Sequence, residues 1–221
     1  MTSERWTEVD AYLSEALVPS DLQLETVRAA SREAGLPEID VSPMQGKFLH
    51  LLAVIQGARR ILEIGTLGGY STIWLAKALP QGGRIVTLEA SPKHAAVATA
   101  NIARAGCDRI IRVIVGRALE TLPQLAQTEP EPFDFIFIDA NKEDTAAYFD
   151  WALKLSRPGT LIVVDNVVRK GALVEASNPD PAVQGMRRFI ERIANEPRVI
   201  ASGLQTVGAK GYDGFVLARV K

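Results

Sequence analysis

The sequence predicts an α/β fold in which a mostly parallel sheet carries helices on both faces. Through the middle of the chain, short runs rich in β-branched residues alternate with segments whose apolar residues recur at helical spacing. This alternation indicates right-handed crossovers between parallel strands, with helices covering the sheet. Two of the apolar runs also end in polar residues, at Asp139 and at Asp165-Asn166. Since such sheets bind ligands beyond the carboxyl ends of their strands, these residues are candidate ligand-binding groups.

Three helices are expected before the first strand, at residues 6–17, 21–34 and 43–56, separated by Pro19 and Pro37. Their amphipathic patterns leave two alternatives open: they could cover the site, or they could form a dimer contact.

The remaining elements follow in alternation. Five strands are expected, at 60–65, 84–89, 110–115, 133–139 and 160–165. Helices are expected between them, at 70–79, 94–105, 118–126 and 145–155. A loop at 167–180 then precedes a helix at 181–194 and two strands, near 198–207 and 214–220, which flank a turn at 208–213.

Length and composition favour a single domain over residues 1–221, with a helical cap at 1–57 and a core at 58–221. The net charge of -1, from 25 basic and 26 acidic residues, provides no polycationic surface for nucleic acid or anionic lipid, so a small-molecule partner is expected. The single Cys107 excludes an intramolecular disulfide and a Cys-rich metal site. Neither a signal-like start nor a long apolar segment is found, which predicts a cytoplasmic protein without a membrane association.

A glycine-rich loop follows the first strand and opens a helix, with glycines at 65, 68 and 69. Glycines let the backbone approach a ligand closely, but this spacing is neither the dinucleotide fingerprint nor a P-loop. Glu89 closes the second strand, where a carboxylate in a nucleotide-binding fold accepts hydrogen bonds from ribose hydroxyls. A ribose without a pyrophosphate indicates S-adenosylmethionine as the cofactor. For the loop alone, a glycine-rich turn beside a solvated Glu89 is the alternative.

The strand ends predict a metal site with a base beside it. Asp139, Asp165 and Asn166 supply oxygen ligands for a divalent cation, magnesium first, with manganese, calcium and zinc as alternatives. A catechol bound through both oxygens would be acidified by the ion, and Lys142 could remove the proton from the reacting hydroxyl. Considered alone, Lys142 would be a solvated lysine at a helix start; next to the other three residues, a base is favoured.

Five segments, at 40–48, 62–71, 137–142, 164–167 and 205–214, carry a resemblance that extends over nearly the whole chain. In that order they resemble the cation-dependent class I O-methyltransferases, the family of catechol and caffeoyl-CoA O-methyltransferases, and the small bacterial members most of all. The resemblance implies a Rossmann-like class I methyltransferase fold, with a seven-stranded sheet whose last strand is antiparallel, and usually a homodimer. It implies methyl transfer from S-adenosylmethionine to a vicinal hydroxyl of a small phenolic substrate.

The resemblance also implies roles for individual residues. Asp139, Asp165 and Asn166 match the metal ligands, and Lys142 matches the catalytic lysine that acts beside Asp139. The residues expected at the cofactor are Val41, Glu63, Gly65, Gly69, Tyr70, Ser71, Glu89, Ala90, Ala118, Asp139 and Ala140. Within this set, the backbone at Val41 is expected to meet the cofactor carboxylate, and Ala118 and Ala140 to line the adenine.

The chain departs from many bacterial relatives at Asn141, where they carry aspartate; the missing charge bears on metal preference or adenine contacts. The loop at 168–173 does not fix the acceptor: Arg169 and Lys170 could meet a carboxylate on it, although a solvated basic loop is favoured. His50 and His94 are interpreted as structural or surface residues, because neither has a ligand partner nearby in sequence.

Three other functions remain as alternatives. Methylation of a hydroxylated transfer RNA base keeps the cofactor, although the near-neutral charge disfavours nucleic acid. An NAD-type oxidoreductase and a non-catalytic adenosine-binding module are disfavoured by the absent dinucleotide fingerprint and by the presence of Asp139, Lys142, Asp165 and Asn166.

Overall fold

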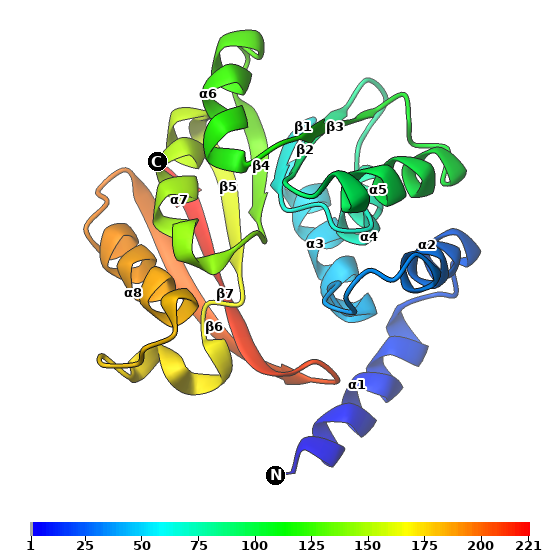
Figure 1. Cartoon of the computed structure of the whole chain (residues 1–221), viewed down its shortest axis with the longest axis horizontal. Helices are drawn as coiled ribbons and strands as arrows, with labels where there is room; N and C mark the ends of the chain where they lie inside the picture. Colours follow the sequence, from blue (N-terminus) through cyan, green and yellow to red (C-terminus); the bar gives the residue numbers. More distant parts are fainter. Residues whose placement is uncertain (1) are drawn as a thin grey trace.

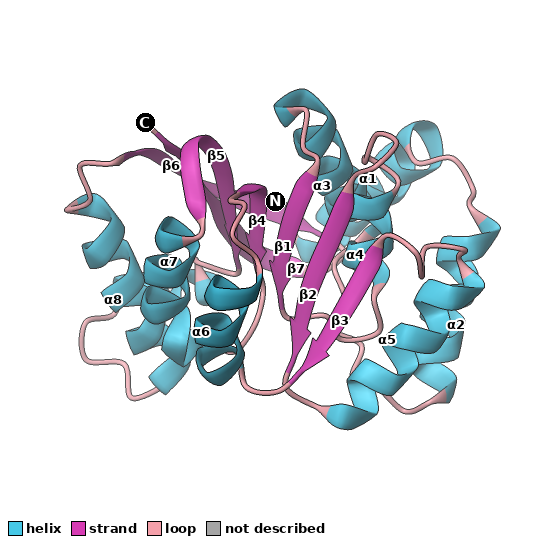
Figure 2. Cartoon of the chain, turned by 90° about the horizontal axis from the view of Figure 1, so that it is seen from above, coloured by secondary structure: helices cyan, strands magenta, loops and turns pink. Residues whose placement is uncertain are grey.

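In the computed structural model, a seven-stranded sheet with helices on both faces forms the body of the protein (Figures 1 and 2). The structure describes residues 2–221. The strands are β1 (Arg60–Ile64), β2 (Arg84–Glu89), β3 (Ile111–Val115), β4 (Phe133–Ile138), β5 (Ser156–Asp165), β6 (Val199–Gly208) and β7 (Gly211–Val220). The α-helices are α1 (Ser3–Leu17), α2 (Leu22–Glu33), α3 (Pro43–Gln56), α4 (Tyr70–Ala76), α5 (Pro92–Arg104), α6 (Ala118–Thr128), α7 (Thr145–Lys154) and α8 (Pro181–Ala194). Two short 3₁₀ segments, η1 (Lys142–Asp144) and η2 (Arg169–Val174), follow β4 and β5.

The strand order is β3-β2-β1-β4-β5-β7-β6. The first five strands pair in parallel, whereas β7 pairs antiparallel with both β5 and β6. The predicted fold class is therefore confirmed, including the antiparallel last strand of the chain. The order reverses between β1 and β4, which is where open sheets of this kind bind ligands.

Two apolar cores lie on opposite faces of the sheet. Leu62, Ile136 and Val164 face α6, α7 and α8. Their sequence neighbours Ile61, Phe135 and Val163 face α2 to α5 on the other side. Figure 2 shows the two groups of helices with the sheet between them. Because both faces are covered, the central strands read as continuous apolar runs, which is the pattern that predicted them.

Three helices begin at the residues that the sequence indicates or close to them, because serine or aspartate precedes a proline there. Ser42, Ser91 and Asp180 each accept a hydrogen bond from a backbone N–H in the first turn of α3, α5 and α8. Proline at the next position is preorganised for a helix and lacks only an N–H that would have had no partner. No helix within residues 2–221 has both the length and the apolar character that crossing a bilayer requires.

The expected turn at 208–213 is too long. Gly208 pairs with Gly211, so Ala209 and Lys210 alone form the turn, and Tyr212 and Asp213 belong to β7. Glycine and aspartate are turn formers in isolation, but here the pairing with β6 decides their conformation. The strand β5 likewise begins at Ser156, earlier than expected.

A buried carboxylate holds the amino-terminal end of the sheet together. Asp134 of β4 accepts hydrogen bonds from the backbone N–H groups of Arg59 and Arg60, at 2.9 and 3.0 Å, before β1 and at its start. Its other oxygen accepts from Arg157 Nη2 of β5 at 2.5 Å. One side chain thus joins β1, β4 and β5 at the end of the sheet opposite the candidate site.

The boundary between a cap at 1–57 and a core at 58–221 stays a prediction. The structure shows that the segment after α2, residues 36–41, lines the pocket described next, whereas α1 contacts α3 and β6 (Figure 1).

Candidate active site

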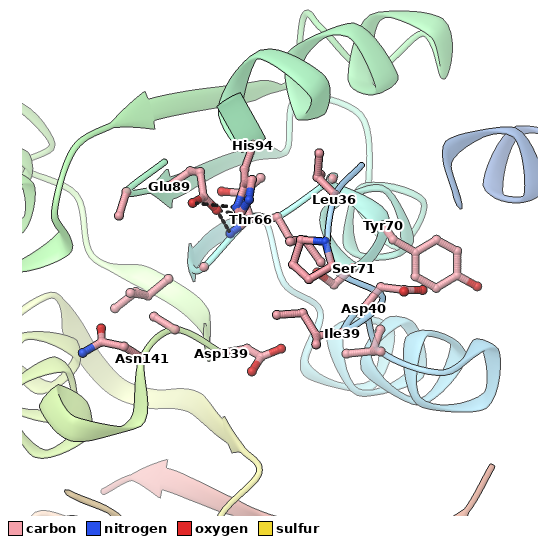
Figure 3. A pocket seen from close by; sticks show the side chains of 18 of the residues that line it. Leu36, Ile39, Asp40, Thr66, Tyr70, Ser71, Glu89, His94, Asp139 and Asn141 are labelled. Carbon is pink, nitrogen blue, oxygen red and sulfur yellow. Dashed lines mark hydrogen bonds and ion pairs between the residues drawn. The ribbon is translucent and has the colours of Figure 1, made fainter. Parts of the chain in front are cut away.

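A pocket of about 450 Å³ opens at the carboxyl ends of the central strands (Figure 3). Its wall is made by residues 36–41, the loop after β1, the ends of β2 and β4, and the residues that follow β5. The pocket therefore lies at the reversal of strand order, where the fold predicts a ligand site.

The glycine-rich loop passes directly against the strand that carries Asp139. Gly65 has φ +102°, and a Cβ at this position would overlap the backbone carbonyl of Asp139. Leu67 also lies in the left-handed region, at φ +50°. Asn101 of α5 braces the loop, because its Nδ2 donates to the Gly68 carbonyl oxygen at 2.9 Å. The loop is thus fixed by contacts that only a small residue at 65 permits.

Glu89 is buried and holds the loop by its carboxylate. Its Oε2 accepts from the backbone N–H groups of Thr66 and Leu67 at 3.1 and 2.8 Å, as Figure 3 shows for the Thr66 side of the pocket. His94 Nδ1 lies 3.5 Å from Glu89 Oε1 and lines the same pocket. His94 reaches the pocket because the turn into α5 brings it back over the end of β2. Its interpretation as a structural or surface residue stays a prediction.

Glu63 lies beneath the pocket floor rather than in its wall. It is fully buried and accepts hydrogen bonds from Ser71 Oγ at 2.7 Å, Thr72 Oγ1 at 2.5 Å and Thr87 Oγ1 at 2.7 Å. Burial raises the pKa of Glu63 to about 7, although the three hydroxyl donors oppose that shift. Because Ser71 does line the pocket, Glu63 fixes the direction of a hydroxyl that faces the ligand space.

At the other end of the pocket, two carboxylates converge. Lys142 Nζ lies 2.5 Å from Asp139 Oδ1. Asp165 is buried and accepts from Gln45 Nε2 at 2.6 Å and from the backbone N–H of Asn166 at 2.8 Å. Burial, and then the nearby negative charge of Asp139, raise the pKa of Asp165 above its usual range. Asn166 is in the left-handed conformation, at φ +57°, and its side chain lines the pocket.

This donor set fits a hard divalent cation. Two carboxylates that repel one another, followed by one amide oxygen, are the ligands that Mg²⁺ takes while it keeps several waters. Within residues 2–221, no group of three or more His, Cys, Asp or Glu side chains is arranged so that it could hold a metal ion. The donor set at this end of the pocket is therefore two carboxylates and one amide.

The predicted site residues fall into two groups. Those that line the pocket are Val41, Gly65, Tyr70, Ser71, Glu89, Ala90, Ala118, Asp139, Ala140, Lys142 and Asn166. Those that do not are Glu63 and Asp165, which lie behind the wall, and Gly69, whose Cα faces Ala98 and Ile102 of α5.

Sequence reasoning missed several residues of the pocket. Arg28 and Asp40, which pair at 2.9 Å, line it near Tyr70. Gln45 contacts Asp165 across a separation of 120 residues, for which no local pattern exists. Asp40 and Gln45 lie in segment 40–48, which carries the resemblance, whereas Arg28 lies outside all five segments.

Asn141 lines the pocket and is held by two neighbours. Tyr148 Oη donates to Asn141 Oδ1, and Asn141 Nδ2 donates to Asp144 Oδ2 at 2.8 Å. The amide thus provides both an acceptor and a donor, whereas an aspartate here would provide acceptors only.

Comparisons with known proteins agree with this geometry. The family model described as O-methyltransferase matches residues 11–221. The chain is 52% identical to a catechol O-methyltransferase of Niastella koreensis, over 100% of both chains. Its structure superposes on the O-methyltransferase from Bacillus cereus in complex with S-adenosylhomocysteine (SAH) with a TM-score of 0.98, at 60% identity over 100% of both chains. The O-methyltransferase TomG from Streptomyces achromogenes, involved in tomaymycin synthesis and solved with S-adenosylmethionine, gives a TM-score of 0.96 at 53% identity, over 100% of this chain and 99% of that one.

Proposed function

The chain belongs to the O-methyltransferase family, and within that family we propose that it transfers a methyl group from S-adenosylmethionine to one hydroxyl of a small catechol, with the help of a divalent cation. It is a methyltransferase that depends on S-adenosylmethionine, so the oxidoreductase and the non-catalytic binding module are excluded. The acceptor class and the metal are the proposed parts.

The donor is proposed to bind along the wall from the glycine-rich loop to Ala118. The acceptor oxygens of Glu89 suit the ribose hydroxyls, and the backbone at Gly65 leaves room for a close approach of the donor. Ser71, directed by Glu63, offers a hydroxyl at the start of α4. The roles of Ala118 and Ala140 at the adenine remain part of the same proposal.

The acceptor is proposed to lie at the end of the pocket formed by Asp139, Lys142 and Asn166. A divalent cation held by Asp139, Asp165 and Asn166 would act there as a Lewis acid that lowers the pKa of the acceptor hydroxyl. Lys142, in its neutral form, takes the hydroxyl proton on Nζ. The acceptor oxygen then forms a bond to the methyl carbon as the bond from that carbon to sulfur breaks, which leaves a neutral thioether.

The single observation that carries this proposal is the convergence of two carboxylates, an amide and a lysine at one end of the pocket. Lys142 Nζ lies against Asp139 Oδ1, so the proposed base and a proposed ligand are in direct contact. Chemistry of this type depends mainly on alignment of the hydroxyl with the methyl carbon, and residues on rigid strand ends are suited to provide it.

The test is transfer of labelled methyl from S-adenosylmethionine to catechol, with Mg²⁺ and then with EDTA. We expect turnover that EDTA abolishes and Mg²⁺ restores. Lys142→Met should lower kcat by about 10²- to 10⁴-fold with unchanged SAH affinity. Lys154→Met, at an exposed position of α7, is the matched control and should keep full activity.

Metal binding has a separate measurement. Titration with Mn²⁺, followed by electron paramagnetic resonance, should give one bound ion in the wild type and a greatly weakened site in Asp165→Asn. Turnover that is equal with EDTA and with Mg²⁺ would refute the metal part. Methyl transfer to transfer RNA that carries a hydroxylated base, but to no catechol, would replace the small-molecule acceptor by RNA.

We propose that a second copy of the chain covers the exposed apolar face formed by α1, α3 and β6. No residue of α1 is buried, and its apolar side chains Tyr12 and Leu17 are exposed. Leu51 and Ile55 of α3 are exposed as well, and α1 contacts both α3 and the edge strand β6. Figure 1 shows α1 projecting from the body of the molecule. Exposed apolar residues on three elements that α1 brings into contact are typical of a protein interface.

Light scattering on the wild type should give the mass of a dimer. The double variant Tyr12→Glu, Ile55→Glu should give a monomer, whereas Tyr12→Phe should not change the mass. A monomeric wild type at the same concentration would refute this interface.

A further inference from the structure

Arg169 is a cationic side chain in the wall of the candidate active site. It lies in η2, three residues after Asn166, and lines the same pocket as Asn166, Lys142 and Tyr148. The adjacent Lys170 is exposed and is not part of the wall. The conformation of this loop therefore places Arg169 in the pocket wall and Lys170 outside it, a difference that the sequence alone does not indicate.

The guanidinium of Arg169 has no anionic partner among residues 2–221. Its Nε is buried and has no hydrogen-bond partner, and no ion pair within residues 2–221 includes Arg169. Three acidic residues of the pocket have other partners: Asp139 contacts Lys142, Asp40 pairs with Arg28, and Glu89 accepts from the backbone of the glycine-rich loop. The fourth, Glu38, is exposed and forms no ion pair with Arg169. An unpaired cation in a partly buried wall costs free energy, which a ligand with a complementary anion would recover.

The backbone that carries Arg169 is strained and braced. Arg169 and Lys170 have φ values of +54° and +56°, in a region of backbone conformation that residues other than glycine rarely adopt. Asp213 of β7 compensates, because its Oδ1 accepts from the backbone N–H groups of Val168 and Arg169, both at 3.0 Å. Strain that the surrounding structure maintains in this way is typical of functional positions.

We propose that Arg169 forms a carboxylate subsite in the acceptor end of the pocket, so that the preferred acceptor is a catechol bearing a carboxyl group. The guanidinium is a planar fork that matches a carboxylate through two parallel hydrogen bonds. A neutral catechol would leave this fork unpaired, whereas an acid would neutralise it. The inference rests on the proposed catechol methylation and adds the chemical class of the substrate.

The test compares two acids of different reach, 3,4-dihydroxybenzoate and 3,4-dihydroxycinnamate, with neutral catechol and with the methyl ester of each acid. We expect the wild type to prefer at least one acid over its ester by about tenfold or more in kcat/KM. Arg169→Gln should lose about 10- to 100-fold on that acid, mainly through KM, and change less than about threefold on catechol. Arg169→Lys should retain part of the preference, because it keeps the charge but not the fork.

Lys170→Gln is the matched control, since it removes a charge from the same strained loop outside the pocket wall. It should leave the preference for the acid unchanged. Equal losses of Arg169→Gln on the acid and on catechol would overturn the subsite, because that pattern indicates a distorted loop. An equal response of the two variants would overturn it as well.

A binding measurement separates this inference from the proposed function. Calorimetric titration of the SAH-loaded protein with acid and ester requires no turnover. If the wild type methylates no catechol, the proposed function fails, and the subsite still stands on tighter binding of the acid that Arg169→Gln abolishes. If acid and ester bind with equal affinity, the subsite is refuted whether or not transfer occurs.

Discussion

Replacing Glu63 by glutamine should remove a loss of stability that the ligand-free protein undergoes as the pH rises through neutrality. Glu63 is fully buried, and its pKa rises from 4.5 to about 7 on folding. A shift of this size corresponds to about 3 kcal/mol, since one pKa unit is worth about 1.4 kcal/mol. Glutamine keeps the shape and one carbonyl acceptor for the Thr72 and Thr87 hydroxyls, but it never ionises.

The sign of the effect follows from the raised pKa. Between pH 4.5 and about 7 the folded protein holds the Glu63 proton more tightly than the unfolded chain, so the contribution of Glu63 to stability is fully present below this window and is lost as the pH rises through it. The glutamine variant lacks this loss. Relative to the wild type, its free energy of unfolding should therefore gain about 2 kcal/mol between about pH 5 and about pH 8.

Urea denaturation gives the free energy of unfolding of both proteins at these two pH values. Subtracting the difference between the proteins at the lower pH from that at the higher pH cancels any cost of the substitution that does not depend on pH. Glu191→Gln, at an exposed position of α8, is the control and should show no dependence on pH. A difference between wild type and Glu63→Gln that is the same at both pH values would refute the reasoning. It would mean that Glu63 is ionised to the same extent in the folded and the unfolded chain.

Three further substitutions test other contacts. Asn141→Asp should lower the free energy of unfolding by about 1 to 2 kcal/mol, because Asp144 loses a hydrogen-bond donor and faces a like charge. Urea denaturation at neutral pH checks this, and an unchanged midpoint would contradict it. Asp213→Ala should raise the acceptor KM at least about tenfold and leave SAH affinity intact, since it removes the hydrogen bonds that brace the loop after β5. Steady-state kinetics measures the first effect and calorimetry the second. An equal loss of acceptor and SAH affinity would indicate general unfolding. Gly65→Ala should abolish SAH binding in calorimetry, because its Cβ would displace the backbone of Asp139; binding at wild-type affinity would show that the strand yields.

The sheet and most helices could be predicted because their signals are local. The continuous apolar run from Phe133 to Ile138 identifies a central strand, and Ser91 before Pro92 marks a helix start. The hairpin turn was misjudged because Asp213 resembles a turn residue, whereas its carboxylate in fact binds backbone N–H groups of another loop. Only the packing of η2 on β7 makes this visible.

The candidate site was predictable only in part, for a related reason. Asp139 and Asp165 end adjacent parallel strands, so topology alone brings them together. Gln45 and His94 reach the site from helices whose docking on the sheet no local pattern specifies. Arg169 differs from Lys170 only in the direction that a strained backbone imposes, which composition cannot encode.

The carboxylate of Asp134 has a bearing on how this protein can change over evolutionary time. By tying β1, β4 and β5 at the end remote from the pocket, it adds to the strand pairing a fixed point that the loops at the other end do not contribute to. Insertions or substitutions around residues 36–41 or 168–174 can then alter which molecule is accepted without disturbing the alignment of Gly65 with Asp139. Conversely, a substitution at Asp134 would shift the reactive groups at the opposite ends of the strands. Its first visible effect would be a loss of catalysis, although Asp134 itself contacts no ligand.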